Sequence, residues 1–233
     1  MTTPVPPAVL ARLDAALRTA ADPVRAAAAA RYMRDQFPFL GLTAAQVSSL
    51  GRAALADLGP PTEEELAGVA LACWERPERE YQYFACGYLR RYASVGSPAL
   101  LPTVRTLITT KSWWDTVDAL AAHTVGALVA AHPALVSTMD EWVVDPNLWL
   151  ARTAILHQLT YRRRTDADRL FRYCTLQAGH PDFFIRKAIG WALRQYARTD
   201  PAAVRSYVDD HRAMLAPLSV REATRTRQAS PKT

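Results

Sequence analysis

Two tryptophans and two carboxylates lie together in the segment KSWWDTVDALAA, residues 111–122. Its apolar residues recur at helical spacing, so we predict a helix with Ser112 as N-cap and Asp115 returning a capping-box interaction. On that helix Trp114 and Asp118 are four residues apart and share a face. An ionised carboxylate beside an indole could stabilise a developing cation or orient a water. The alternative is a core tryptophan and a surface aspartate.

The composition supports a folded, basic protein. Its 233 residues are 50% hydrophobic, enough for a sizeable core, and 28 Lys and Arg against 22 Asp and Glu give a net charge of +6. Only Lys111, Lys187 and Lys232 are lysines, so arginine carries the excess. Because the arginine fork matches phosphate geometry, this balance favours an anionic partner such as nucleic acid.

The cysteines and the hydropathy pattern exclude several classes. Cys73, Cys86 and Cys174 are an odd number without CxxC spacing, so we expect neither a disulfide framework nor a zinc site, and a reducing cytoplasmic setting. No cationic segment precedes a long apolar run at the N-terminus, and no stretch approaches 18 uncharged apolar residues. We therefore expect no signal peptide and no membrane association.

Alanine- and leucine-rich segments follow one another along the chain, separated by proline or glycine and never by alternating β-branched runs. The pattern predicts an all-α protein, with four prolines in first helical turns, at Pro23, Pro98, Pro133 and Pro201. Helices are expected over residues 8–20, 23–36, 44–58, 63–75, 78–92, 98–109, 112–131, 133–143, 148–161, 166–178, 182–197 and 201–213. The polar, basic residues 221–233 are expected to form a disordered tail.

A period of 34 residues relates Asp118, Arg152 and Arg186. The same offset aligns RTAIL with RKAIG, and His157 with Trp191. Such a period in helical pairs is typical of an α-solenoid, so we predict a single domain over residues 1–220 with about six HEAT-like pairs and a concave DNA-binding face.

The residues that this register directs into the groove are basic and aromatic, with one carboxylate among them. They are Trp114, Asp118, Arg152, Arg186, Lys187, Trp191 and Arg194, with Tyr161 and residues 162–164 at a helix end. Arginines on such a face could follow a phosphodiester backbone. The alternatives are a solvated face for the arginines and core packing for the tryptophans.

Other catalytic signatures are absent from the sequence. There is no GxxxxGK[ST], GxGxxG or HExxH motif, and the five histidines show no paired ligand spacing. His157 lies in an apolar run, where a satisfied, partly buried histidine is the favoured interpretation. We expect no metal ion and no organic cofactor.

Four long blocks carry a family resemblance: RYMRDQFPFLGL (31–42), TTKSWWDTVDALA (109–121), LWLARTAILHQLTYRRRTD (148–166) and FFIRKAIGWALRQYARTDPAAVRSYV (183–208). On these blocks the chain resembles an AlkD-type DNA glycosylase, of the HEAT-like-repeat family of DNA alkylation repair enzymes. The resemblance implies hydrolysis of the N-glycosidic bond of cationic alkylated purines, 7-alkylguanine and 3-alkyladenine, in duplex DNA, without base flipping, for base excision repair.

The resemblance also implies roles for individual residues. Asp118 would be the catalytic carboxylate, bracketed by Trp114 and Trp191, while Arg152 would contact a phosphate and Tyr32 the DNA. Arg186, Lys187 and Arg194 are further predicted DNA contacts, from the groove register. Ala151 departs from the family pattern, where a second basic side chain is expected, which puts the strength of local phosphate binding in question.

A cationic purine is a good leaving group, so one fixed anion near the sugar suffices and no general acid is needed. Because no lysine lies beside Asp118 on its helix face, we expect no lyase step and hence a monofunctional hydrolase. We also expect a monomer. The alternative is a non-catalytic HEAT-repeat module that binds DNA or protein, with Asp118 in a surface ion pair; a carboxylate beside phosphates would then weaken DNA binding, which speaks against it.

Overall fold

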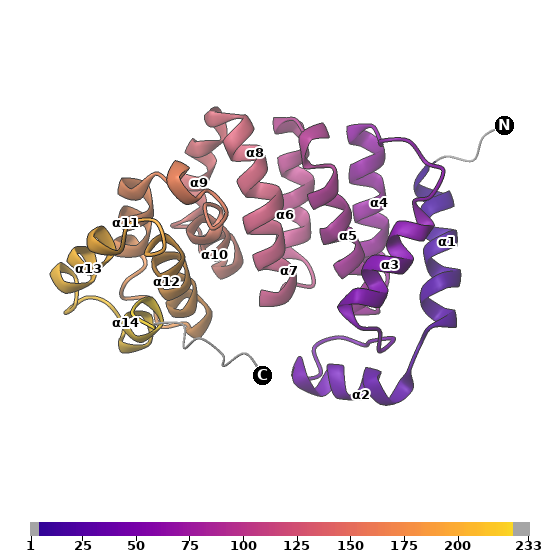
Figure 1. The fold of residues 1–233 in the computed structure, drawn as a ribbon, viewed down its shortest axis with the longest axis horizontal. Helices are drawn as coiled ribbons and strands as arrows, with labels where there is room; N and C mark the ends of the chain where they lie inside the picture. Colours follow the sequence, from indigo (N-terminus) through magenta and orange to yellow (C-terminus); the bar gives the residue numbers. More distant parts are fainter. Residues whose placement is uncertain (1–4, 226–233) are drawn as a thin grey trace, which may run out of the picture. The chain divides into compact units, whose positions relative to one another are not determined.

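The computed structural model describes residues 5–225, which form helices joined by short loops and contain no β-strand (Figure 1). The fold class predicted from the sequence, an all-α HEAT-like α-solenoid, is confirmed. The chain divides into two compact units, unit 1 ending at Leu120 and unit 2 beginning at Ala121. The single domain expected over residues 1–220 stays a prediction.

Unit 1 contains the helices from α1 to α7. They are α1 (Val5–Thr19), α2 (Pro23–Tyr32), α3 (Ala44–Ala54), α4 (Glu63–Glu75), α5 (Arg79–Arg91), the 3-10 turns η1 (Ala93–Val95) and η2 (Pro98–Leu100), α6 (Leu101–Thr109) and α7 (Trp114–Ala119). A π-helix, η3 (Leu120–Val125), follows α7.

Unit 2 contains the helices from α8 to α14. They are α8 (Gly126–Ala131), η4 (Pro133–Leu135), α9 (Val136–Trp142), α10 (Leu148–Leu156), η5 (Arg162–Arg164), α11 (Ala167–Leu176), α12 (Phe183–Tyr196), α13 (Pro201–Asp210) and α14 (Pro217–Ala223). None of the helices in the described part of the chain is long and apolar enough to cross a bilayer.

Local sequence signals explain where several helices begin. Thr43 and Thr62 form complete capping boxes with Gln46 and Glu65 at the starts of α3 and α4. The four prolines predicted in first turns all lie at the first or second helical position. There the missing N–H has no intrahelical partner to lose, so proline is tolerated.

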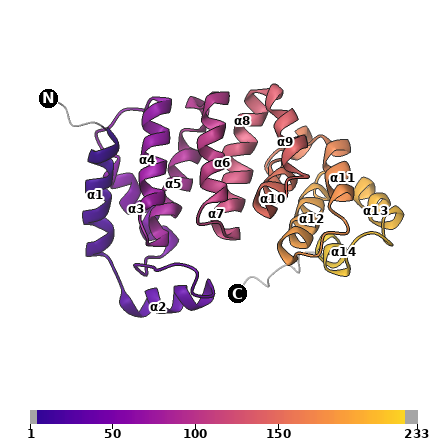
Figure 2. The same cartoon turned by 180° about the vertical axis from the view of Figure 1, so that it is seen from behind.

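Unit 1 is built around α4, which packs on α1, α5 and α6 (Figures 1 and 2). Leu66, Val69 and Ala70 of α4 are fully buried. Burying a side chain of leucine size stabilises a fold by about 1.5–3 kcal/mol, so this face of α4 fixes the positions of α5 and of the elements that α5 holds.

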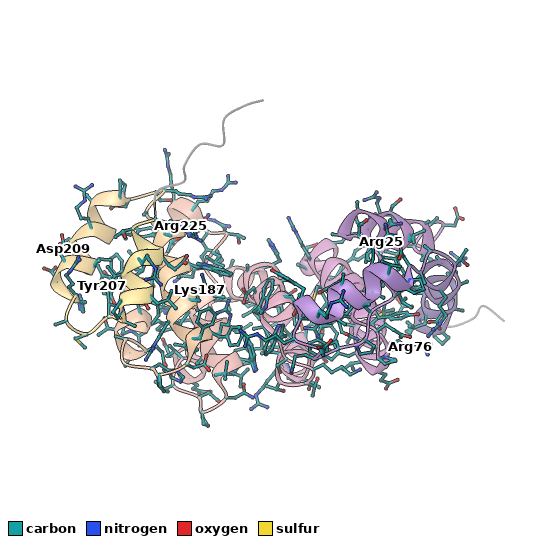
Figure 3. All side chains as sticks on the ribbon, turned by 90° about the horizontal axis from the view of Figure 1, so that it is seen from below. Arg25, Arg76, Lys187, Tyr207, Asp209 and Arg225 are labelled. Carbon is teal, nitrogen blue, oxygen red and sulfur yellow. The ribbon has the colours of Figure 1, made fainter. Side chains whose placement is uncertain are left out.

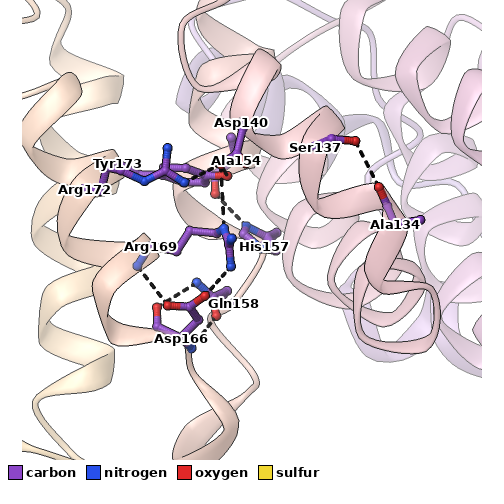
Figure 4. Close-up of polar contacts among 10 residues, drawn as sticks. All are labelled: Ala134, Ser137, Asp140, Ala154, His157, Gln158, Asp166, Arg169, Arg172 and Tyr173. Atoms are coloured by element: carbon purple, nitrogen blue, oxygen red, sulfur yellow. Dashed lines mark hydrogen bonds and ion pairs between the residues drawn. The ribbon is translucent and has the colours of Figure 1, made fainter.

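Unit 2 is built around α12, which packs on α10, α11, α13 and α14. Gly190 permits the close approach of α14, because a Cβ at this position would collide with the Cβ of Glu222. Between α9 and α11, the carboxylate of Asp140 accepts hydrogen bonds from Tyr173 Oη and Arg172 Nη2, both at 2.6 Å (Figure 4). These contacts tie successive helical pairs together.

The 34-residue register is visible in the helices. Asp118, Arg152 and Arg186 occupy the fifth, fifth and fourth positions of α7, α10 and α12. Each of these helices follows a partner along the chain, and contacts are found for the pairs α9 with α10 and α11 with α12. The period therefore locates the second helices of successive pairs.

Several expected boundaries are wrong. The helix expected over residues 112–131 is divided into α7, the π-helix and α8, because apolar spacing does not reveal a local change in hydrogen-bond register. The helix expected to reach residue 161 ends at Leu156. Helix α14 extends to Ala223, so the tail does not begin at residue 221, since Glu222 and Ala223 are buried. Residues 226–233 of that predicted tail lie outside the described residues.

Candidate functional site

Helix α7 holds the tryptophan and the carboxylate of the predicted site in unit 1. Trp114 is its first residue and Asp118 follows four positions later, so the two lie one helical turn apart, and both are half-buried. Trp113, with extended backbone at φ −159 and ψ 159, is the N-cap residue and makes no side-chain cap bond. The sequence prediction that Trp114 and Asp118 share a helix is confirmed.

The predicted capping box of this helix is wrong. The hydroxyl of Ser112 donates to the carbonyl of Ile108 at 2.6 Å. The carboxylate of Asp115 accepts a bidentate pair of hydrogen bonds from Arg79, 3.0 Å from Nε and 2.6 Å from Nη2. A charged, two-point contact of this kind is stronger than a neutral cap bond, so Asp115 binds a residue of α5 and not its own helix.

Arg79 has no exposed surface, and each side of its guanidinium is occupied. Besides Asp115, it donates from Nη2 to Thr116 Oγ1 and from Nη1 to the carbonyl of Lys111, both at 2.8 Å. The hydroxyl of Tyr83 donates to Asp115 Oδ2 at 2.7 Å. Burial, with the nearby Asp115 charge, raises the pKa of Tyr83, so the phenol stays a donor.

Tyr32, the last residue of α2, reaches the same place. Its ring lies edge-on to the Trp114 ring, with centroids 6.4 Å apart and an interplanar angle of 78°. Its side chain is 73% exposed, and α2 has no buried residue at all. Three predicted site residues are therefore gathered within unit 1: Tyr32, Trp114 and Asp118.

In unit 2, two cations lie close to the indole of Trp191. Arg152 of α10 is 1% exposed and donates to the carbonyl of Phe184. Its Cζ lies 5.4 Å from the centroid of the Trp191 ring, and Lys187 Nζ lies 5.6 Å from the same centroid. These distances are within the range of cation–π attraction, so Trp191 is held by two cations of its own unit.

Lys187 and Arg194, both predicted DNA contacts, bind the same buried carboxylate. Glu222 of α14 is 2.7 Å from Lys187 Nζ and 3.0 Å from Arg194 Nη1. The Lys187 hydrogen bond and the charges of Lys187 and Arg194 lower the pKa of Glu222 against the opposing effect of burial. Lys187 is labelled on its helix in Figure 3. Arg186 donates from Nε to the carbonyl of His180 at 2.9 Å.

Comparisons with known proteins identify the family. Residues 13–226 match the family model described as DNA alkylation repair enzyme. The chain belongs to this family.

A solved structure titled "Predicted DNA alkylation repair enzyme from Enterococcus faecalis" has 30% sequence identity and a TM-score of 0.81, covering 90% of this chain and 98% of that one. The crystal structure of smu.31 from Streptococcus mutans UA159 has 16% identity and a TM-score of 0.59, covering 75% and 89%, and supports the fold alone. No curated protein matches the chain.

As a member of the DNA alkylation repair enzyme family, the chain is a DNA repair enzyme that acts on DNA. The family resemblance stated from the sequence is confirmed. Its individual site residues divide between the units, with Tyr32, Trp114 and Asp118 in unit 1 and the others, Arg152, Arg186, Lys187, Trp191 and Arg194, in unit 2. That both sets face one groove stays a prediction.

Two charged residues of this family member were missed by the sequence analysis. Arg79 lies on the same face of α5 as Tyr83 and Cys86, at intervals of four and seven residues, so a cation in line with these residues was the available signal. Glu222 follows Pro217, which begins α14 in the same way that Pro201 begins α13. The basic composition of the following residues concealed that helix start.

Proposed function

We propose that this protein is a monofunctional DNA glycosylase that hydrolyses the N-glycosidic bond of cationic alkylated purines, 7-alkylguanine and 3-alkyladenine, in duplex DNA. Base excision repair would begin with this step. The observation that supports it most is the half-buried Asp118 carboxylate, one turn from the Trp114 indole on a helix that Arg79 fixes to α5.

The proposed chemistry needs little more than that carboxylate. Alkylation at N7 or N3 gives the purine a positive charge, so it departs without protonation as the C1′–N bond lengthens. The sugar then develops oxocarbenium character, which a preorganised anion stabilises. Asp118 would supply this anion and orient the water that attacks C1′; the water's proton leaves to solvent, and the neutral base and an abasic site are the products.

The aromatic residues would act on the sugar and not on the base. Trp114 and Trp191 would pack their faces against the deoxyribose, excluding water and attracting the developing cation. The cations near Trp191, Arg152 and Lys187, suit a phosphodiester that passes this ring. If no pocket encloses the base, selection rests on the leaving-group charge, and 7-methylguanine and bulkier 7-alkylguanines should leave at similar rates.

The direct test uses a duplex with one N7-methylguanine and protein in excess. We expect free 7-methylguanine to appear faster than in the protein-free duplex, with abasic sites in equal amount and strands intact until alkali is added. Release at the protein-free rate while the duplex is bound would overturn the proposal in favour of a non-catalytic DNA-binding module. Covalent trapping of protein on DNA by borohydride would overturn the monofunctional assignment.

A further inference from the structure

Two adjacent charges at the start of α5, Arg79 and Glu80, are fully buried and hold different segments of unit 1. Arg79 holds the beginning of α7 through Asp115, Thr116 and the carbonyl of Lys111. Because its five N–H groups lie in a rigid plane, a fork bound at so many points allows little displacement of the segment that it binds.

Glu80 holds the loop that follows α2. Its carboxylate accepts hydrogen bonds from the backbone N–H groups of Leu40 at 2.9 Å, Gly41 at 2.8 Å and Leu42 at 3.2 Å. Gly41 has φ +88, and a Cβ there would collide with the carbonyl of Asp22. The loop is thus fixed in a conformation that favours glycine.

Arg79 reaches this loop as well. Its Cζ lies 3.8 Å from the centroid of the Phe37 ring, and its backbone N–H donates to the carbonyl of Pro38 at 2.9 Å. Phe37 is five residues after Tyr32. One buried guanidinium therefore contacts both chain segments whose aromatic rings, Tyr32 and Trp114, meet at 6.4 Å.

We propose that Arg79 is a positioning residue, which acts through Asp115 to fix the start of α7 and hence the Trp114 indole and the Asp118 carboxylate. In catalytic terms this inference rests on the proposed glycosylase function. The two carboxylates of the WWDTVD segment then have different tasks: Asp115 is the anchor of the helix, and Asp118 is the group that faces the reaction.

The most informative variant is Arg79→Lys. It keeps a positive charge beside Asp115, so the carboxylate is not left buried without a counter-charge. A lysine ammonium cannot make the two-point contact together with the bonds to Thr116 and Lys111. We expect the rate of 7-methylguanine release at saturating enzyme to fall about tenfold, with unchanged affinity for an undamaged duplex.

The matched control is Arg76→Lys. Arg76 also belongs to unit 1 and pairs with a carboxylate, Asp14, at 2.6 Å, and it is labelled in Figure 3. Its side chain makes no contact with α7 among those described, and Lys111 binds only its carbonyl. We expect this variant to keep the wild-type excision rate.

A spectroscopic measurement separates positioning from the proposed chemistry. The protein is labelled with 5-fluorotryptophan, and the ¹⁹F resonance of Trp114 is assigned by its loss in Trp114→Phe. This resonance should shift in Arg79→Lys and keep its position in Arg76→Lys. The resonance of Trp142 in α9 should keep its position in both variants. An unmoved Trp114 resonance in Arg79→Lys would overturn the positioning role, whether or not the protein proves to be a glycosylase. An inactive wild type with a shifted resonance would overturn only the glycosylase.

A double-variant cycle then asks whether Arg79 acts through Asp118. In the Asp118→Asn background, Arg79→Lys should lower the residual rate by less than twofold, because the carboxylate to be positioned is gone. A full tenfold loss there would overturn the claim. If Arg79→Lys does not fold, Tyr83→Phe takes its place, because this change removes only the 2.7 Å bond from Tyr83 to Asp115. The ¹⁹F resonance of Trp114 should then show a smaller shift. An unmoved resonance would overturn the proposal.

Discussion

Units 1 and 2 each hold a site tryptophan beside a buried ion pair, but with opposite signs of charge. In unit 1 the buried ion is a cation, Arg79, bound by the Asp115 carboxylate next to Trp114. In unit 2 it is a carboxylate, Glu222, bound by Lys187 and Arg194, with Lys187 close to Trp191. Removing the buried member's partner from such a pair leaves an uncompensated charge, so both pairs are expected to be sensitive to substitution.

The difference indicates a division of tasks within the proposed function. The predicted site residues of unit 1 are two aromatics and an acid, suited to a cationic sugar, whereas those of unit 2 are cations around an indole, suited to the phosphodiester. Variants of Trp114 and Asp118 in unit 1 should therefore change the rate of excision, and variants of the cations in unit 2 should change affinity and its dependence on salt.

The largest expected effect is that of Asp118→Asn. The amide keeps the size of the side chain but removes the charge nearest to the developing cation, so excision should fall on the order of 10²-fold or more, roughly 3 kcal/mol. Duplex affinity should hold or tighten, since a repulsive charge is lost. The measurement is single-turnover release of 7-methylguanine, with spontaneous depurination subtracted.

Glu75→Gln provides the comparison, because Glu75 is an exposed carboxylate of the same unit on α4. It should leave the rate unchanged. If Asp118→Asn released 7-methylguanine at the wild-type rate, Asp118 would be an ordinary surface residue. The proposed difference between the units would then be removed.

The place of Asp118 could be predicted from sequence because periodicity is a local property, whereas its catalytic role was implied by the family resemblance. Spacing located Asp118, Arg152 and Arg186 at the fifth, fifth and fourth positions of α7, α10 and α12, and turn signals gave the bounds of α4 to the residue. The partners of Asp115 could not be found in the same way. Arg79 is 36 residues away, and which carboxylate it binds depends on how α5 packs against α7.

The same reason explains the wrong N-cap at Ser112. Its hydroxyl and the Asp115 carboxylate have the sequence pattern of a capping box, but a long-range bidentate contact outcompetes the local one. Likewise the burial of Glu222 depends on Gly190, which admits α14, and no pattern within α14 alone reveals this close approach.

The next largest effect concerns acid stability, where the units differ because all five histidines follow Ala121. His157 is 2% exposed and interacts through Nδ1 with the carbonyl of Ala154, 2.7 Å away (Figure 4). Burial lowers the pKa of His157 to about 4 from an ordinary value near 6.5. The unfolded state therefore binds the proton first, and stability present above pH 6.5 is lost as pH falls toward 4.

Between pH 7 and pH 5 this difference should lower the free energy of unfolding by about 2 kcal/mol. Urea titrations at the two pH values measure it, and His157→Gln, which cannot titrate, should lose most of that dependence. The comparison is His211→Gln at the half-buried C-cap of α13, which should keep it. Equal pH dependence in wild type and His157→Gln would show that other groups control the acid stability.

A smaller effect is expected for Glu222→Gln, which asks whether the cations of unit 2 are available to DNA. The change releases Lys187 and Arg194 from a shared charge, so affinity for any duplex should rise roughly fivefold, about 1 kcal/mol, and the salt slope should steepen by about 1. Fluorescence anisotropy at several salt concentrations measures both quantities.

Glu141→Gln on α9 makes the same change in net charge at an exposed position and should leave the slope unaltered. If both variants tighten binding equally, the gain reflects net charge alone, and Lys187 and Arg194 do not belong to the DNA contact.

The smallest effect separates the ring of Tyr32 from its hydroxyl. Tyr32 is 73% exposed, so solvent screens its edge-on contact with Trp114, and the lower part of the range for aromatic pairs applies, about 0.6 kcal/mol. Tyr32→Leu should therefore lower single-turnover excision about threefold, while Tyr32→Phe stays near wild type. Since α2 buries no residue, neither change should move the melting temperature. If Tyr32→Phe instead weakened duplex affinity threefold with an unchanged excision rate, the hydroxyl would be a phosphate contact. Unit 1 would then contribute to duplex affinity as well as to the rate.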